Sequence, residues 1–478
     1  MVTAVELTDH PATTTLGELR ASDHRHREVK DEIRENLVAR LAAGEPSLPG
    51  IVGFDDTVVP EVERALLAGH DLVVLGERGQ GKTRLIRTLS GLLDEWTPVV
   101  AGCEINDHPY APSCRRCQAL IGERGDEAPV AWLHRSSRYG EKLATPDTSV
   151  GDLIGDIDPI KVAEGRTLGD PETVHYGLLP RTNRGIFSVN ELPDLAERIQ
   201  VSLLNVLEER DIQVRGYALR LPLDVLLVAS ANPEDYTNRG RIITPLKDRF
   251  GAEVRTHYPL ELADEVDLIE QEARLVWPVG STHAAPVVPD HLVDLIARYT
   301  RLVREAPQVD QRSGVSARFA IAAVETVAAS AVRRAAVTGE RAVARVCDLP
   351  AVVPASRGKV EFDDADEGRE LEVLRHLLRR ATAETFRARL AGVDLTALQA
   401  KFDEGATVET GDDVAAAELL RQIGPYAGLA VLLERLGIAE GAEDPGLAAA
   451  ATEFALEGLH LSRRLAKDEI DGRVVYGS

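Results

Sequence analysis

Cysteine is scarce in this chain, with four residues among 478. So few thiols in a chain of this length do not suggest a disulfide scaffold. Long apolar runs are also missing, because no stretch approaches the roughly 18 residues of a membrane-spanning helix. The N-terminal stretch carries acidic side chains and lacks the basic start and apolar core of a secretory signal. We therefore expect a cytoplasmic protein without a membrane span.

Basic residues are outnumbered, with 55 lysines and arginines against 78 acidic residues and a net charge of -23. This charge repels a phosphate backbone unless the basic residues cluster on one face, so nucleic acid is an unlikely main partner. Hydrophobic residues at 44% and charged residues at 28% are ordinary values for a globular protein. The length allows two or three packed units.

The pattern of apolar residues changes along the chain. A charged helical stretch ends in a turn near residue 46, and from there to residue 258 short apolar runs alternate with helical segments. This alternation predicts an α/β domain with a parallel sheet and helices on both faces. Helical spacing then dominates, apart from a brief strand expected at 359–362. The predicted domains are an N-terminal helical extension (1–46), the α/β domain (47–258), a helical lid (259–356) and a C-terminal helical domain (357–478).

The clearest motif is a phosphate-binding loop, which follows the predicted strand 71–75 and precedes a helix. It matches G-x-x-x-x-G-K-[ST] with residues Gly76, Glu77, Arg78, Gly79, Gln80, Gly81, Lys82 and Thr83. In such a loop backbone N–H groups surround the phosphates, the lysine reaches the terminal phosphates, and the threonine hydroxyl binds Mg²⁺. The alternative is a chance glycine-rich turn, which the matching flanks make improbable. The sequence therefore predicts a nucleotide site.

Two further strand ends carry polar residues suited to hydrolysis. The predicted strand 186–189 runs into Asn190 and Glu191. Glu191 is placed to orient the attacking water, and Asn190 to support Mg²⁺ through a water molecule without supplying a negative charge. The next strand, 224–230, ends at Asn232, whose amide can hydrogen-bond the water or the terminal phosphate. The alternatives are a helix cap for the first pair and an ordinary turn for the second.

The order of these elements resembles AAA+ ATPases of the MoxR and magnesium chelatase ATPase-subunit group, over about residues 48 to 350. Besides the phosphate loop, the resemblance rests on Ile51-Val52-Gly53, Leu153-Ile154-Gly155-Asp156, Gly177-Leu178-Leu179, Arg184-Gly185-Ile186, Ser230-Ala231-Asn232-Pro233 and Leu246-Lys247-Asp248-Arg249-Phe250. It implies the P-loop AAA+ fold, with ATP and Mg²⁺ as cofactors. It also implies that the segment 211–222 is a hairpin facing a pore or a substrate.

The resemblance assigns roles to two arginines. Arg249 is implied to be an arginine finger that reaches the nucleotide of a neighbouring subunit, and Arg318 a lid arginine that contacts phosphate. A planar guanidinium suits the charge spread over the oxygens of a loose phosphoryl transition state. The alternative for each is a surface or salt-bridged arginine. A finger acting in trans implies a self-assembled ring, which we expect to be a hexamer.

Three of the cysteines lie close together in the sequence. Cys103, His108, Cys114 and Cys117 offer three thiolates and one imidazole, the ligand set of a closed tetrahedral zinc site, although only the last two cysteines have standard knuckle spacing. The alternative is three ordinary cysteines in a loop. The sequence leaves both interpretations open.

The sequence leaves three functions open. The leading hypothesis is a ring-forming ATPase, chaperone-like in action, that remodels or activates a protein client. The chain encodes no integrin-like metal-binding domain, so a von Willebrand factor A-type protein is one candidate client. The second hypothesis is the ATPase subunit of a metal chelatase that inserts Mg²⁺ into a tetrapyrrole. The third is a slowly hydrolysing, nucleotide-dependent switch, which Asn190 favours.

Overall fold

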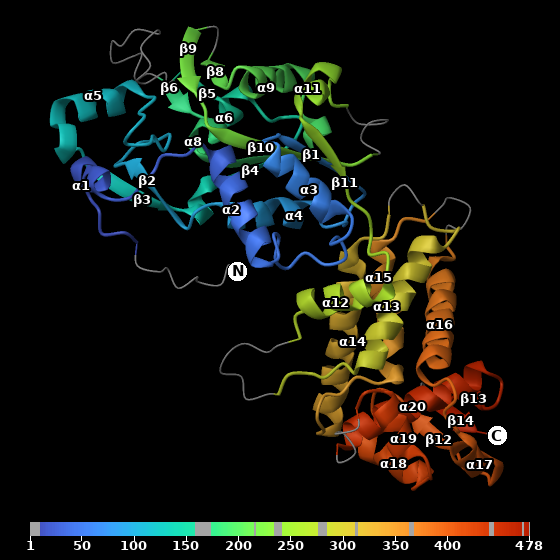
Figure 1. The fold of residues 1–478 in the computed structure, drawn as a ribbon. Helices are drawn as coiled ribbons and strands as arrows, with labels where there is room; N and C mark the ends of the chain where they lie inside the picture. Colours follow the sequence, from blue (N-terminus) through green and yellow to red (C-terminus); the bar gives the residue numbers. More distant parts are fainter. Residues whose placement is uncertain are drawn as a thin grey trace. The chain divides into compact units, whose positions relative to one another are not determined.

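The computed structural model describes residues 10–157, 174–214, 217–233, 241–275, 284–310, 314–362, 368–438, 444–470 and 473–477. The chain divides into two compact units, Met1–His257 and Tyr258–Ser478 (Figure 1). The finer boundaries predicted near residues 46 and 356 fall inside these units and stay predictions.

The first unit is built on a parallel sheet of five strands in the order β11-β1-β10-β7-β4 (Figure 1). The strands are β1 (Leu72–Leu75), β4 (Tyr139–Leu143), β7 (Gly185–Asn190), β10 (Val225–Ala231) and β11 (Ala252–Arg255). The three predicted strands are therefore present and neighbour one another. The parallel α/β fold predicted from the sequence is confirmed.

Alternate residues of the central strands point into two separate cores. Leu72 and Val74 of β1 belong to one core, and Val73 and Leu75 belong to the other. Helices α2 (Val29–Ala43), α3 (Val58–Leu67) and α4 (Lys82–Thr88) contribute to the first core, and helix α9 (Glu197–Glu208) contributes to the second. Burial of the sheet on both faces explains why its inner strands β1 and β10 are almost wholly apolar, whereas the edge strands β4 and β11 contain charged residues.

Several smaller elements are inserted between the sheet strands. Strands β2 (Trp96–Val100) and β3 (Val130–His134) pair antiparallel, and α1 (Leu16–Ala21) and α5 (Arg115–Arg124) lie in the same region. The predicted hairpin is present as β8 (Asp211–Val214) and β9 (Tyr217–Pro222), although its turn lies outside the described residues. The remaining elements are α6 (Val150–Leu153), β5 (Gly155–Ile157), β6 (Val174–Tyr176), α8 (Leu178–Arg181) and α11 (Thr244–Arg249).

The second unit is mainly helical and has one continuous apolar core. Its helices are α12 (Leu262–Glu272), α13 (Asp290–Glu305), α14 (Ala317–Thr338), α15 (Val352–Ser356), α16 (Glu370–Arg389), α17 (Thr396–Asp403), α18 (Ala416–Ile423), α19 (Leu429–Arg435) and α20 (Pro445–Leu461). No described helix combines the length and the apolar character that crossing a bilayer requires.

The second unit also contains a small antiparallel sheet that the sequence analysis missed. Strand β14 (Arg473–Gly477) pairs with β12 (Val408–Thr410) on one side and with β13 (Ala466–Ile470) on the other. The strand expected at 359–362 is instead reduced to a single bridge between Val309 and Phe362. A lone segment without a pairing partner does not form a stable strand.

A buried ion pair connects helix α2 to the edge of the parallel sheet. The guanidinium of Arg138, directly before β4, donates to both carboxylate oxygens of Glu32 at 2.7 and 2.6 Å. Both side chains are at most 5% exposed. The Nε–H group of Arg138 donates to the Arg184 carbonyl at 2.7 Å. Removal of either partner would therefore leave the other charge desolvated and unpaired.

We predict that Glu32→Ala lowers the free energy of unfolding of the first unit by about 3–5 kcal/mol, because Arg138 keeps its buried charge. The neighbouring Asp31→Ala is the control, since Asp31 forms an exposed pair with Arg34 on the same helix. That change should cost less than about 0.5 kcal/mol. Denaturant unfolding measures both, and equal losses in the two variants would contradict the assignment.

Candidate nucleotide site

The phosphate-binding loop connects the end of β1 to the start of α4. Gly79 and Gly81 adopt positive φ angles of 75° and 76°, a backbone region that glycine occupies without steric cost. Gly76 is required for a different reason, since a Cβ there would lie 1.9 Å from the Thr256 hydroxyl oxygen. The glycines of the motif therefore shape the loop and allow β1 and the residue after β11 to approach closely.

The lysine of the motif is buried against the loop and the neighbouring strand. Lys82 is 7% exposed. Its ammonium group donates to the carbonyl oxygens of Gly76 at 2.5 Å and Glu77 at 2.8 Å, and to Asn232 Oδ1 at 2.6 Å. The structure therefore brings together Lys82 and Asn232, which the sequence analysis placed in one site from separate motifs.

Glu191 completes a chain of polar contacts across three adjacent strand ends. Asn232 Nδ2 donates to Glu191 Oε2 at 2.7 Å, so the amide of Asn232 connects Lys82 to the carboxylate. Glu191 follows β7 with φ 55° and ψ 48°, the left-handed region that a residue with a side chain adopts at a cost. Its N–H donates to the Ser230 hydroxyl at 3.3 Å.

Asn190 lies on the other side of this chain and contacts a carboxylate that the sequence analysis did not identify. Its Nδ2 donates to Glu141 Oε1 at 2.7 Å, and its Oδ1 accepts from the hydroxyls of Ser188 and Ser230, each at 3.3 Å. Glu141 belongs to β4, where it is the register partner of Ser188 on β7. No motif marks Glu141, so only the strand pairing reveals it.

Glu141 is held in its charged form by a residue of the phosphate-loop helix. Arg87 of α4 donates to both carboxylate oxygens at 2.8 and 2.9 Å. This side-chain hydrogen bond from Arg87 is the main reason why the pKa of Glu141 lies below its usual value. A negative charge therefore stands beside Asn190, at a position where the motif itself offers none.

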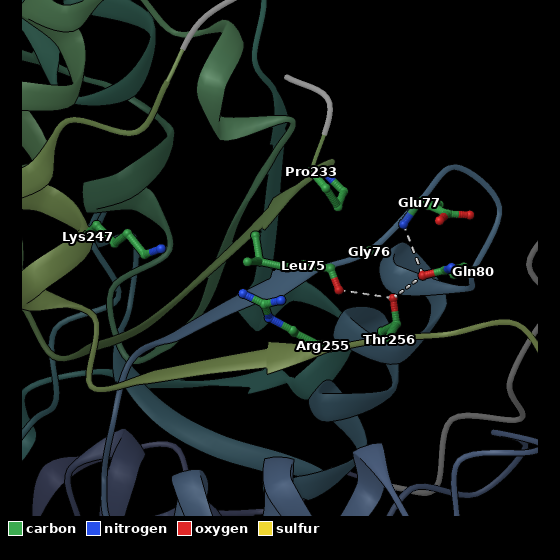
Figure 2. A pocket seen from close by; sticks show the side chains of 8 residues that line it. All are labelled: Leu75, Gly76, Glu77, Gln80, Pro233, Lys247, Arg255 and Thr256. Atoms are coloured by element: carbon green, nitrogen blue, oxygen red, sulfur yellow. Dashed lines mark hydrogen bonds between the residues drawn. The ribbon is translucent and has the colours of Figure 1, made fainter. Parts of the chain in front are cut away.

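A cavity of about 360 Å³ opens beside the loop (Figure 2). Figure 2 shows Gln80 Oε1 between two donors, the Glu77 N–H at 3.0 Å and the Thr256 hydroxyl at 2.9 Å. Its lining residues are Leu75, Gly76, Glu77, Gln80, Pro233, Lys247, Arg255 and Thr256. The cavity thus lies next to the first half of the predicted phosphate loop, and Gln80 and Thr256 hold its wall in place.

The two predicted arginines lie in different units. Arg249 ends α11, and its guanidinium binds Glu208 of α9 at 2.7 Å and the Pro245 carbonyl at 2.8 Å. Arg318 is exposed in the first turn of α14, which Ser316 caps through the Arg318 N–H. Both roles stay predictions.

The cysteine cluster forms with a different fourth residue from the one expected. The thiols of Cys103, Cys114 and Cys117 and a carboxylate oxygen of Asp107 all lie within 4.8 Å of one another. His108 is not part of this group, because its Nδ1 accepts from the Tyr110 N–H at 3.0 Å and its Nε2 lies 3.1 Å from that of His24. The prediction of His108 as a ligand is therefore corrected to Asp107.

Comparison with known proteins finds relatives of the first unit. A family model of the Sigma-54 interaction domain matches residues 166–249. The magnesium-chelatase 38 kDa subunit of Cereibacter sphaeroides is 30% identical over 210 residues, which cover 41% of this chain and 54% of that protein. The magnesium-chelatase subunit ChlI of Synechocystis is 32% identical over 253 residues, covering 49% of this chain and 65% of that protein.

The chain spans about half to two thirds of the length of these two relatives. Among solved structures, a chain from the complex between subunits BchI and BchD of magnesium chelatase matches with a TM-score of 0.35 and 22% identity, over 71% of this chain and 94% of that one. The sequence relatives, together with the phosphate loop and the strand ends around Lys82, support an AAA+ ATPase similar to the group of MoxR and the magnesium chelatase ATPase subunits.

Proposed function

We propose that the chain hydrolyses ATP and uses the reaction, as a ring of identical subunits, to remodel or activate a protein client. The observation that carries the proposal is the continuous chain of hydrogen bonds from Lys82 through Asn232 to Glu191. It joins the residue type that binds phosphate to the residue type that activates water. These groups lie at the ends of neighbouring parallel strands, where α/β proteins bind their ligands.

Lys82 has to exchange partners when ATP binds. Its ammonium has three donors, and the described contacts use three oxygens, two of which are carbonyls of the loop itself. A terminal phosphate carries more negative charge than a carbonyl and forms stronger, charge-assisted hydrogen bonds. We therefore expect phosphate to displace the carbonyls of Gly76 and Glu77 from Lys82, while the loop opens around it.

The Mg²⁺ that accompanies ATP in this family would be bound by oxygen atoms of Thr83, Asn190 and Glu141. Hydroxyl, amide and carboxylate oxygens are the donors that Mg²⁺ prefers, so the residues present fit the ion. When bound, Mg²⁺ neutralises charge on the β- and γ-phosphates. In this proposal Glu141 supplies the negative charge that Asn190 lacks, and the hydrogen bond between them fixes the amide orientation.

Separate variants should divide binding from hydrolysis. Lys82→Ala should abolish ATP binding, whereas Glu191→Gln should retain binding and lower turnover by about 100- to 10,000-fold, the range for loss of a general base. Glu123→Gln on exposed α5 makes the same chemical change away from the site and should leave both unchanged. Phosphate release and binding of a fluorescent nucleotide give the two readouts. Full turnover by Lys82→Ala would refute the site.

A charge relocation tests the role of Glu141. Glu141→Gln should raise the Mg²⁺ concentration for half-maximal turnover by about 10- to 100-fold, the usual effect of losing a residue that supports a metal ligand. Adding Asn190→Asp to that variant should restore most of the Mg²⁺ affinity, because the charge returns to the adjacent strand.

Glu61→Gln, on the exposed surface of α3, serves as the control for Glu141→Gln. Its Mg²⁺ dependence should match that of the unchanged protein. If Glu141→Gln also shows an unchanged Mg²⁺ dependence, or if the double variant is no better than the single one, Glu141 has no part in the metal site.

Mixed assemblies test whether Arg249 acts in trans. Lys82→Ala and Arg249→Ala proteins should each be nearly inactive alone. In an equal mixture that exchanges subunits, a complete site takes its intact Lys82 from an Arg249→Ala subunit and its intact Arg249 from an adjacent Lys82→Ala subunit. This arrangement occurs at about a quarter of the interfaces of a closed ring. Turnover should therefore recover to about a quarter of the unchanged value.

The control mixture combines Lys82→Ala with Asn232→Ala. Both changes damage the nucleotide site of the subunit that carries them, so no interface in that mixture is complete and turnover should stay at the level of the separate proteins. A mixture of Lys82→Ala and Arg249→Ala that also stays at this level would remove the trans role. Sedimentation of the same samples with ATP reports whether a hexamer forms.

Two other functions keep specific support. The named relatives are subunits of magnesium chelatase, which favours a chelatase role with partner subunits that hold the tetrapyrrole. Asn190 favours a slow switch, for which tight ATP binding with turnover near background would be decisive. The Glu191→Gln protein, which should retain ATP, is the form in which to seek a client such as a von Willebrand factor A-type protein.

A further inference from the structure

The loop between β2 and α5, together with the first turn of α5, gathers four potential metal ligands in one place. The sulfur atoms of Cys103, Cys114 and Cys117 and a carboxylate oxygen of Asp107 are mutually within 4.8 Å. All four belong to a single short segment of the first unit, so the nucleotide site contributes none of them. A tetrahedral ion with metal–sulfur bonds of about 2.3 Å separates its sulfur ligands by about 3.8 Å, which fits this spacing.

Backbone hydrogen bonds hold three of the four ligand atoms in position. The Asp107 N–H donates to Cys103 Sγ, and the Cys117 N–H donates to Cys114 Sγ, each at 3.4 Å. The Cys114 N–H in turn donates to Asp107 Oδ2 at 2.9 Å, which orients the carboxylate toward the thiols. The positions of these ligand atoms are therefore fixed by the backbone of the segment itself.

The surrounding lobe has little apolar core to stabilise it. Its separate cluster has Leu16, Leu19, Ala128 and Val130 as buried residues in the described chain, with Tyr110, Ile121 and Trp132 packed against them. Cys103 and Cys114 pack instead against the larger core on one face of the sheet. Small cores are often supplemented by disulfides or by a structural metal. None of the three cysteines forms a disulfide in the structure. A metal ion held by these cysteines would therefore connect a lobe that has a small core of its own to the larger core of the sheet.

We propose that Cys103, Asp107, Cys114 and Cys117 bind one Zn²⁺ as a closed structural site that stabilises the lobe formed by α1, β2, β3 and α5. Three soft thiolates exclude Mg²⁺ and Ca²⁺, which require oxygen ligands. Four protein ligands fill a tetrahedral shell and leave no open position for catalysis. His108 stays outside the shell because its ring nitrogens face Tyr110 and His24.

The test uses the full-length protein, purified without chelator and reconstituted with zinc sulfate before removal of excess ion. Elemental analysis should give about one zinc per chain. Cys114→Ser should lower this to a small fraction of an equivalent, whereas Cys347→Ser should leave it unchanged, because Cys347 lies in the second unit. Less than about half an equivalent in the unchanged protein overturns the site.

Substitution with Co²⁺ separates the proposed ligand set from the one with histidine. The unchanged protein should show the intense visible bands of tetrahedral cobalt together with sulfur-to-cobalt charge-transfer absorption. Asp107→Ala should weaken Co²⁺ and Zn²⁺ binding by about 10- to 100-fold or more and alter the visible bands. His108→Ala should change neither. The reverse pattern would overturn the assignment of Asp107, and zinc retained at full stoichiometry in Cys114→Ser would overturn the site itself.

Discussion

One buried cation, the ammonium group of Lys82, links the ends of neighbouring strands in the first unit through its hydrogen bonds. A desolvated ammonium must have its donors satisfied, and those of Lys82 reach Gly76, Glu77 and Asn232. Asn232 lies directly after β10, between the ends of β1 and β7 in the sheet order. Its side chain uses its oxygen for Lys82 and its nitrogen for Glu191. The parallel sheet register therefore joins the residue predicted to bind phosphate to the residue predicted to activate water, although they come from distant parts of the sequence.

The sequence predicted the features that depend on local pattern and missed those that depend on pairing. Glycine spacing and apolar flanks were enough to predict the loop and its strands, and the order of strands brought in Asn232. Glu141 was missed because its position depends on the register between β4 and β7. Asp107 was missed because Asn106, at φ 56°, turns the chain so that Asp107 and not His108 faces the cysteines. The β12–β14 sheet was missed because β13 is short and largely exposed, and so lacks an apolar pattern.

The ion pairs of Arg249 with Glu208 and of Arg87 with Glu141 stabilise the fold too little to prevent these side chains from binding a ligand instead. The Glu208 side chain that binds Arg249 is 54% exposed, and the Arg87 side chain that binds Glu141 is 61% exposed. Exposed pairs of this kind contribute about 0–1 kcal/mol. A nucleotide phosphate presented by a neighbouring subunit offers Arg249 more negative charge than a single carboxylate. The contact with Glu208 in the isolated chain is thus compatible with a role in trans. The buried pair of Glu32 and Arg138 differs, because loss of either partner leaves the other charge buried and unpaired.

Glu191, the residue predicted to activate water, has a left-handed backbone conformation. Such a conformation costs about 1–2 kcal/mol for a residue with a Cβ, and it persists only where surrounding contacts hold it. Here the Ser230 hydroxyl and the Asn232 amide hold it, and the carboxylate accepts from Asn232, which also contacts Lys82. If phosphate displaces the carbonyls of Gly76 and Glu77 from Lys82, the contact of Lys82 with Asn232 Oδ1 can persist, and Asn232 Nδ2 can still donate to Glu191. We infer that Asn232 in this way keeps the Glu191 carboxylate in place, beside the lysine that binds the terminal phosphate, for proton transfer from the attacking water.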